Sequence, residues 1–151
     1  MKWVELENQR QYQQYLTELQ GKYTKAESAG EDGSLYGAFH YLTQLAVEKA
    51  PGLESKMGWS ISKIDINHKE EYRSKKYRCT SDAMSHICLA ISKEIVGDTS
   101  LVQQNKISIY GARGNWGIRI NSDILALPEM QEKVQQHMQA VQGQEQQGYT
   151  R

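Results

Sequence analysis

Residues 80–97 have the sequence TSDAMSHICLAISKEIVG, which predicts an amphipathic helix with a signal at each end. Thr80 offers a side-chain oxygen that can cap the first turn, and Gly97 tolerates the left-handed backbone that commonly ends a helix. Apolar side chains recur between them at helical spacing; they are Met84, Ile87, Cys88, Ile91 and Ile95. We expect this stripe to form the helical half of the core.

The residues that follow this helix alternate between apolar and polar, which is typical of strands with one buried face. Ile107 and Ile109 lie on one side of the sequence Gly-Ala-Arg-Gly-Asn, and Ile118 and Ile120 lie on the other. Glycine suits a tight connection because it adopts backbone conformations that other residues avoid. We therefore predict strands near 106–111 and 116–121, joined as a hairpin.

Two further strands are expected before the helix, near 57–66 and 71–79, with a turn at 67–70. The first contains isoleucines that alternate with polar residues. The second is polar, and its Lys75 and Lys76 suit the edge of a sheet, where charge discourages pairing with other chains. These strands predict a second hairpin.

Helices are expected on either side of these strands. Asn8 can cap a helix that ends at Gly21, and Ser34 can cap another that stops before Pro51. A last helix begins near Pro128, because proline is favoured in the first turn. Residues 26–33 are polar and predict a loop.

The predicted order is α-α-β-β-α-β-β-α, which gives an α+β fold. In it, a largely antiparallel sheet of two hairpins packs against about four helices. A chain of 151 residues fits one domain of ordinary size. We assign residues 1–141 to that domain and residues 142–151 to a flexible, glutamine-rich C-terminal tail.

Composition narrows the classes of partner. The 18 basic residues balance the 18 acidic ones, so no strong overall field attracts nucleic acid or an anionic membrane. No apolar run approaches the roughly 18 residues of a membrane span, and the N-terminus lacks the apolar segment of a signal peptide. We expect a cytoplasmic protein without a membrane partner. Residues 63–119 are locally positive, with ten basic and six acidic residues.

The two cysteines, Cys79 and Cys88, are expected to be reduced thiols. Nine helical residues span about 13 Å, whereas a disulfide needs Cα atoms within roughly 7 Å. Asp82 and His86 share a helical face, but Cys88 points about 160° away from Asp82. These side chains therefore do not form a tetrahedral metal site, and we expect no metal and no cofactor.

No catalytic motif is recognisable in the sequence, and no catalytic residue is assigned. The four histidines lie in different predicted elements, outside any nucleophile elbow or HExxH pattern. Dispersed His, Ser and Cys residues leave open a catalytic site that assembles in space. The glycines of residues 111–114 fit a hairpin connection better than a phosphate loop, because a strand follows them instead of a helix.

Two groups of residues combine cations with aromatic rings and are the candidate partner-binding residues. The first group is Tyr72, Lys75, Lys76, Tyr77 and Arg78, and the second is Arg113, Asn115, Trp116 and Arg119. Arginine, tyrosine and tryptophan are frequent anchors of protein interfaces. The alternative interpretations are a solvated sheet edge for the first group and a tryptophan that enters the core for the second.

We expect a non-enzymatic protein-binding module that acts by covering its target, in concrete form a bacterial or phage inhibitor such as an immunity protein. The alternative is a nucleic-acid-binding domain that uses the positive region 63–119. An affinity that falls steeply with salt distinguishes the second function from the first.

Overall fold

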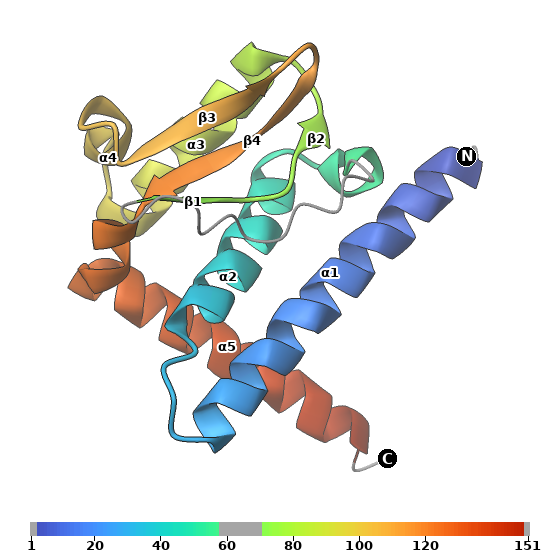
Figure 1. Ribbon diagram of the computed structural model, residues 1–151, viewed down its shortest axis with the longest axis vertical. Coiled ribbons are helices and arrows are strands. Elements are labelled where there is room, and N and C mark those ends of the chain that lie inside the picture. Colours follow the sequence, from blue (N-terminus) through green and yellow to red (C-terminus); the bar gives the residue numbers. More distant parts are fainter. Residues whose placement is uncertain (1–2, 58–70, 150–151) are drawn as a thin grey trace.

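The computed structural model describes residues 3–57 and 71–149, and it shows the predicted α+β architecture in the predicted order (Figure 1). Its helices are α1 Trp3–Ser28, α2 Ser34–Lys49, α3 Ser81–Val96, the short α4 Ser100–Gln103 and α5 Pro128–Tyr149. Two 3-10 turns are η1 Leu53–Lys56 and η2 Ser122–Ala126. The strands are β1 Glu71–Arg73, β2 Tyr77–Arg78, β3 Ile107–Ala112 and β4 Asn115–Asn121. Apart from Met57, the predicted strand 57–66 and turn 67–70 lie outside the described residues.

Strand β4 lies in the middle of the antiparallel sheet and is paired along both edges. The predicted hairpin with β3 is confirmed, in a register that joins Ile107 to Ile120 and Ile109 to Ile118. Along its other edge β4 pairs first with β2 and then with β1. The predicted strand 71–79 is therefore two short strands, and their partner in the described sheet is β4.

Ser74 connects β4 to the chain between β1 and β2. Its backbone N–H donates to the carbonyl of Ile118 at 2.8 Å, and its hydroxyl accepts from the Ile118 N–H at 2.9 Å. A side-chain oxygen thus takes the place of a backbone carbonyl at the position where regular pairing stops. Ser74 is buried. Its hydroxyl therefore gives the Ile118 N–H a hydrogen-bond partner that this donor would otherwise lack in the core.

Helix α3 covers the inner face of the sheet, as predicted. The Thr80 hydroxyl accepts from the Ala83 N–H at 3.1 Å, and Gly97 ends the helix in the left-handed conformation with φ 86°. All five apolar residues of its stripe are buried. They share one core with Ile107, Ile118 and Ile120 of the sheet.

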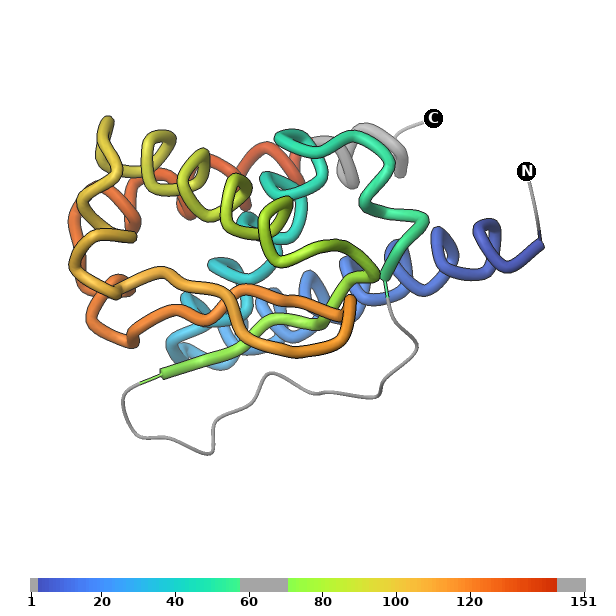
Figure 2. Tube along the Cα trace, turned by 90° about the horizontal axis from the view of Figure 1, so that it is seen from above, coloured from blue at the N-terminus to red at the C-terminus, as the bar shows by residue number. Residues whose placement is uncertain are grey.

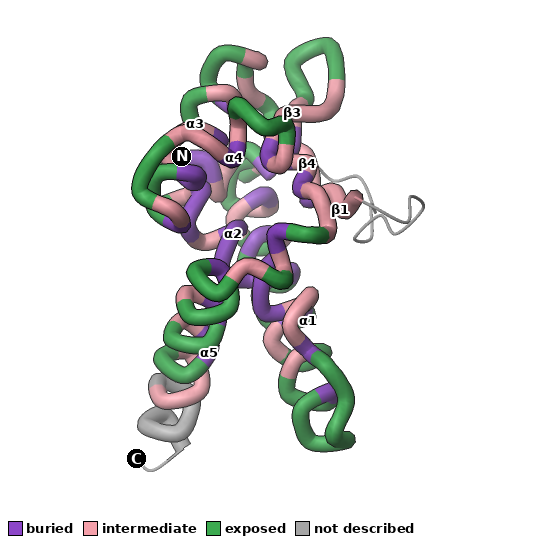
Figure 3. The backbone as a smooth tube through the Cα atoms, turned by 90° about the vertical axis from the view of Figure 1, so that its left-hand side faces the viewer, coloured by how far each residue is buried: buried purple, intermediate pink, exposed green. Residues whose placement is uncertain are grey.

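Helix α2 occupies the centre of the helical layer and contacts α1, α3 and α5. Figure 3 shows its buried turns between α1 and α5, which diverge toward the lower end of the view. The helical spacing of its apolar residues predicts one buried face from Leu35 to Ala46; Leu35 is partly buried, and the others are buried, namely Ala38, Phe39, Leu42, Leu45 and Ala46. The Ser34 side chain does not cap this helix; Gly33 is the N-cap, and the Asp32 carboxylate accepts from the Ser34 N–H.

The predicted ends of the first helix are wrong, since α1 is longer in both directions. It begins at Trp3 and continues through Gly21 to Ser28, so the loop predicted over 26–33 is shorter. Asn8 is not a cap; its amide donates to the carbonyl of Ser55 at 2.8 Å, which ties α1 to η1. Burial of Ala26 beyond Gly21 continues the contact face, and tertiary packing of this kind overrides the weak helix preference of glycine.

Gly21 and Gly37 are both helical, but their surroundings differ. A Cβ at Gly21 meets nothing within 4 Å, whereas a Cβ at Gly37 would lie 3.0 Å from Val134 Cγ1 and 3.2 Å from a ring carbon of Tyr23. Gly37 therefore permits the close approach of α1, α2 and α5, while Gly21 makes no such contact.

This difference predicts opposite effects of one substitution. Gly21→Ala is expected to raise the free energy of unfolding by about 1 kcal/mol, because alanine favours helix and finds open space. Gly37→Ala is expected to lower it by about 1–3 kcal/mol through overpacking. Urea denaturation of the two variants measures both, and equal effects would contradict this description of the α1–α2–α5 contact.

The core position of α3 is tested by truncating Ile91, which has 0% exposure. Ile91→Ala is expected to lower the free energy of unfolding by about 2–5 kcal/mol, and Ile91→Val by about 0.5–1.5 kcal/mol. A loss below about 0.5 kcal/mol for the alanine variant would show that the buried face of α3 is assigned incorrectly.

Candidate functional site

The tip of the β3–β4 hairpin is a two-residue turn that presents an arginine. Arg113 and Gly114 have φ of 53° and 79°, and Ala112 pairs with Asn115 directly across them. Both turn residues thus have the positive φ that two-residue hairpins of this type require. The side chains of Arg113 and Asn115 are exposed.

Strand β2 brings a second arginine to this tip. Arg78 pairs with Asn115, and the Cys79 N–H donates to the carbonyl of Gly114 at 2.9 Å. Because Arg78 is exposed, the predicted residues Arg78, Arg113 and Asn115 lie together although 34 positions separate the first from the second in the sequence. Figure 1 shows the hairpin tip at the upper end of the molecule, and Figure 2, seen from above, shows it beside the green chain of β2.

A groove of about 570 Å³ adjoins this tip between α1, η1 and β2. The residues that line it are Val4, Glu5, Asn8, Ser55, Lys56 and Arg78. Arg78 belongs to both features and links the groove to the turn. We call the groove together with Arg113 and Asn115 the hairpin-end surface. Sequence reasoning missed the contributions of α1 and η1, because neither segment carries a motif and only folding brings them to β2.

The aromatic candidates lie on the core side of the sheet. Tyr77 is 1% exposed, so its ring is part of the core. Trp116 faces Tyr77 across the strands and is half-buried against the core. Tyr72 is also partly buried against it. These rings therefore pack on the core face of the sheet, beneath the hairpin-end surface.

Arg119 lies away from the hairpin tip and forms internal contacts along its whole guanidinium. It donates to Ser108 Oγ at 2.7 Å, to a Glu71 carboxylate oxygen at 3.1 Å and to the carbonyl of Asn105 at 2.7 Å. Its side chain is 15% exposed. Arg119 thus connects β1, β4 and the turn before β3.

The two lysines between β1 and β2 lie over tyrosine rings. Lys75 Nζ is 5.2 Å from the centroid of the Tyr15 ring, and burial lowers the pKa of Lys75. Lys76 Nζ is 5.4 Å from the centroid of the Tyr110 ring. Both distances fit cation–π contacts. Both lysines are therefore in contact with tyrosine rings of the protein itself.

The chemistry of the cysteines agrees with the sequence prediction. Cys79 and Cys88 are both free thiols, and burial raises the pKa of each, to about 12 for Cys88. Such thiols are poor nucleophiles, because the reactive species is the thiolate.

In the part of the chain that the structure describes, no three His, Cys, Asp or Glu side chains are grouped to hold a metal ion. No helix among the described residues is long and apolar enough to cross a membrane.

A pair of histidines that the sequence did not indicate lies between α2 and α5. His40 Nδ1 is 2.8 Å from His137 Nε2, and the Tyr41 ring packs edge-on against His137. One imidazole must donate and the other accept, so at least the accepting ring is neutral in the bonded pair. Burial, with a smaller contribution from His137, lowers the pKa of His40 to about 4, and burial also lowers the pKa of His137. The two positions are 97 residues apart, so no local pattern could predict the contact.

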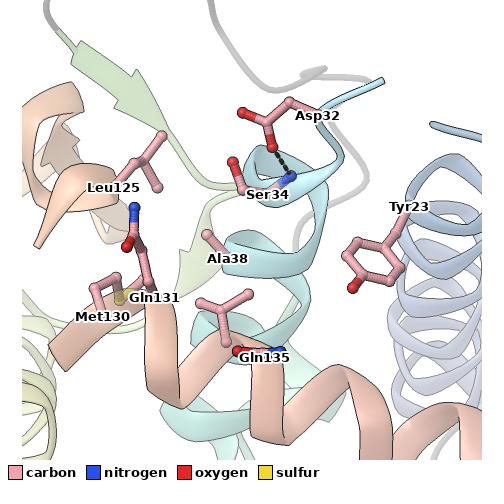
Figure 4. A pocket seen from close by; sticks show the side chains of 9 residues that line it. Tyr23, Asp32, Ser34, Ala38, Leu125, Met130, Gln131 and Gln135 are labelled. Carbon is pink, nitrogen blue, oxygen red and sulfur yellow. Dashed lines mark hydrogen bonds between the residues drawn. The ribbon is translucent and has the colours of Figure 1, made fainter. Parts of the chain in front are cut away.

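A smaller cavity of about 230 Å³ opens between the first turn of α2, η2 and α5 (Figure 4). Its apolar wall includes Ala38, Met130 and Val134. Asp32 and Ser34 stand at one side of the opening, and Leu125 and Gln131 stand across from them. This cavity is separate from the hairpin-end surface.

Comparison with known proteins gives no match to any family model, curated protein or solved structure. The function is therefore inferred from the chemistry of these surfaces.

The histidine pair predicts how stability depends on pH. The folded-state pKa of His40, about 4, lies below the value of about 6.5 for an unfolded chain. The folded state therefore binds fewer protons between these values, and stability is full above pH 6.5 and falls toward pH 4. The shift corresponds to a loss of up to about 3 kcal/mol.

Urea denaturation at intervals between pH 7.5 and 4.5 measures this loss, and His40→Gln is expected to reduce it. His86→Gln changes an exposed histidine on α3 and is expected to leave the wild-type profile in place. If the His40 variant and wild type lost stability in parallel, the assignment of this pH dependence to the pair would be wrong.

Proposed function

We propose that the protein is a non-enzymatic protein-binding module that covers an acidic patch of a partner protein with its hairpin-end surface. The observation that carries this proposal is the register of β2 with β4, which sets Arg78 beside Asn115 and next to the turn that bears Arg113. Occlusion by a rigid surface of this kind is the mode of action of immunity-type inhibitors, and a bacterial or phage inhibitor is the concrete form we infer. A reducing, cytoplasmic location suits the two free thiols.

The charges of the surface favour an acidic partner. Lys56, Arg78 and Arg113 form no ion pair with any residue in the described part of the chain. Glu5 is the acidic residue that lines the groove, so the surface carries a positive excess. Positive and negative patches that face each other raise the association rate and exclude other partners.

The shape of the surface supports the same proposal. The groove of about 570 Å³ lies beside a projecting turn, so a partner can place a side chain in the groove while the two arginines contact its rim. Arg78 pairs with Asn115, and the pair Ala112–Asn115 closes the turn that holds Arg113. Little backbone entropy is lost when such a pre-ordered surface binds.

Nucleic acid is the alternative partner, and the arrangement of the cations favours it less. Phosphate binding needs cations that face the same strand. Arg119 and Arg73 both contact Glu71, and Lys75 and Lys76 lie over tyrosine rings. Within the described residues 71–119, these four cations are thus engaged in contacts within the protein.

The test begins with affinity capture from the source cells, with and without nuclease, and identification of the captured protein by mass spectrometry. The purified partner is then titrated with the wild type and with Arg78→Glu/Arg113→Glu. Loss of two interface arginines is expected to weaken binding more than tenfold, while the melting temperature stays nearly unchanged because both side chains are exposed.

A matched control reverses two exposed charges elsewhere, in Lys25→Glu/Lys93→Glu, and is expected to bind as the wild type does. Trp116 is left intact because its truncation would disturb the core. Equal binding by the Arg78/Arg113 variant would remove the proposed surface. Capture that nuclease abolishes, with an affinity that falls steeply with salt, would establish the nucleic-acid alternative instead.

A further inference from the structure

The cavity between α2, η2 and α5 combines an apolar floor with a polar rim, as small-molecule sites do. Its volume is about 230 Å³. The floor consists of Ala38, Leu125, Met130 and Val134. The rim consists of Tyr23, Asp32, Ser34, Gln131 and Gln135. Figure 4 shows Asp32 and Ser34 on the α2 side of the opening, Gln131 across from them, and Tyr23 approaching from α1.

Asp32 supplies the formal charge of the lining. Its carboxylate accepts from the Ser34 N–H at 2.9 Å, and this bond, together with the Ser34 side chain, lowers the pKa of Asp32. The group is therefore ionised at neutral pH. The lining contains no lysine, arginine or histidine, and Glu27 lies close by, 3.4 Å from the Gly33 N–H. The charged side chains closest to the opening, Asp32 and Glu27, are thus both acidic.

The neutral groups of the rim also suit a hydrogen-bond donor. A carboxylate oxygen has further lone pairs after its bond to Ser34, and the Ser34 hydroxyl and the amide oxygens of Gln131 and Gln135 accept hydrogen bonds. The Tyr23 ring offers an aromatic face, which attracts cations. An anionic ligand would meet no positive side chain in this lining. The negative charge of Asp32 would repel it.

We propose that this cavity binds a small organic ammonium ion, with the ammonium group at Asp32 and Ser34 and a compact apolar body against Ala38, Met130 and Val134. An ammonium group has three donors and no acceptor, which matches a rim rich in acceptors. The volume limits the ligand to about ten non-hydrogen atoms, below the size of typical drug-like ligands. This site is distinct from the hairpin-end surface and does not depend on the function proposed for it.

The probe for this test is benzylamine, compared with its neutral analogue benzyl alcohol and its anionic analogue benzoate. Titrations of the wild-type protein are followed by ¹H–¹⁵N correlation spectra. Benzylamine is expected to shift the amide signals of Asp32, Ser34, Gln131 and Gln135 with millimolar affinity, because few atoms make contact. Benzyl alcohol is expected to bind about three- to fivefold more weakly, as the loss of one partly exposed ion pair predicts, and benzoate is expected not to bind.

Asp32→Asn tests the role of the charge with little change of shape. Asparagine still accepts from the Ser34 N–H, so the start of α2 is preserved. This variant is expected to bind benzylamine and benzyl alcohol equally. Asp82→Asn, the same change in the first turn of α3, is expected to keep the wild-type preference.

A measurement on the wild type alone gives an independent check. Raising the salt concentration to about 0.5 M is expected to weaken benzylamine binding and to leave benzyl alcohol binding unchanged, because salt screens a partly exposed charge. Equal affinities of the three probes for the wild type, shifts confined to other parts of the chain, or an undiminished benzylamine preference in Asp32→Asn would each overturn the proposal.

Discussion

The pairing of β4 along both of its edges is the constraint on which the rest of the structure depends. One edge pairs with β3 through a two-residue turn, and the other pairs with β1 and β2. The inner face of β4 presents Ile118 and Ile120 to α3, and both side chains are at most 1% exposed. Because strand pairing fixes which side chains face the core, a shift of one residue would expose these isoleucines and bury Arg119.

The same register assigns different roles to neighbouring cations. Near Glu71, the side chains of Arg73 and Arg119 both form ion pairs with its carboxylate. At the other end of β4 no acidic side chain of the described chain is paired with Arg78 or Arg113, and these arginines remain exposed. These arginines are thus divided between ion pairs with Glu71 and exposed positions at the hairpin tip. The division follows from strand pairing, which brings Arg119 to Glu71 and Arg78 to Asn115.

Helix α2 is the second organising element, and its surroundings explain the cavity and the histidine pair. Gly37 lets α1 and α5 approach closely at one turn. The helices diverge from there, as Figure 3 shows, and the rim of the cavity forms where the start of α2 meets η2 and α5. One turn further on, His40 contacts His137 between buried apolar side chains. Burial lowers the pKa of both histidines, because removal from water disfavours the charged form.

The sequence by itself determined α3, α2 and the β3–β4 hairpin, because capping residues, helical periodicity and alternation act between residues that are close along the chain. It also named Arg78, Arg113 and Asn115 among the candidate partner-binding residues, but in two separate groups. Only the tertiary structure decided that 71–78 pairs with β4, that α1 continues through Gly21, and that His40 meets His137. These features depend on contacts between distant segments, whose energies come from shared burial and leave no local pattern in the sequence.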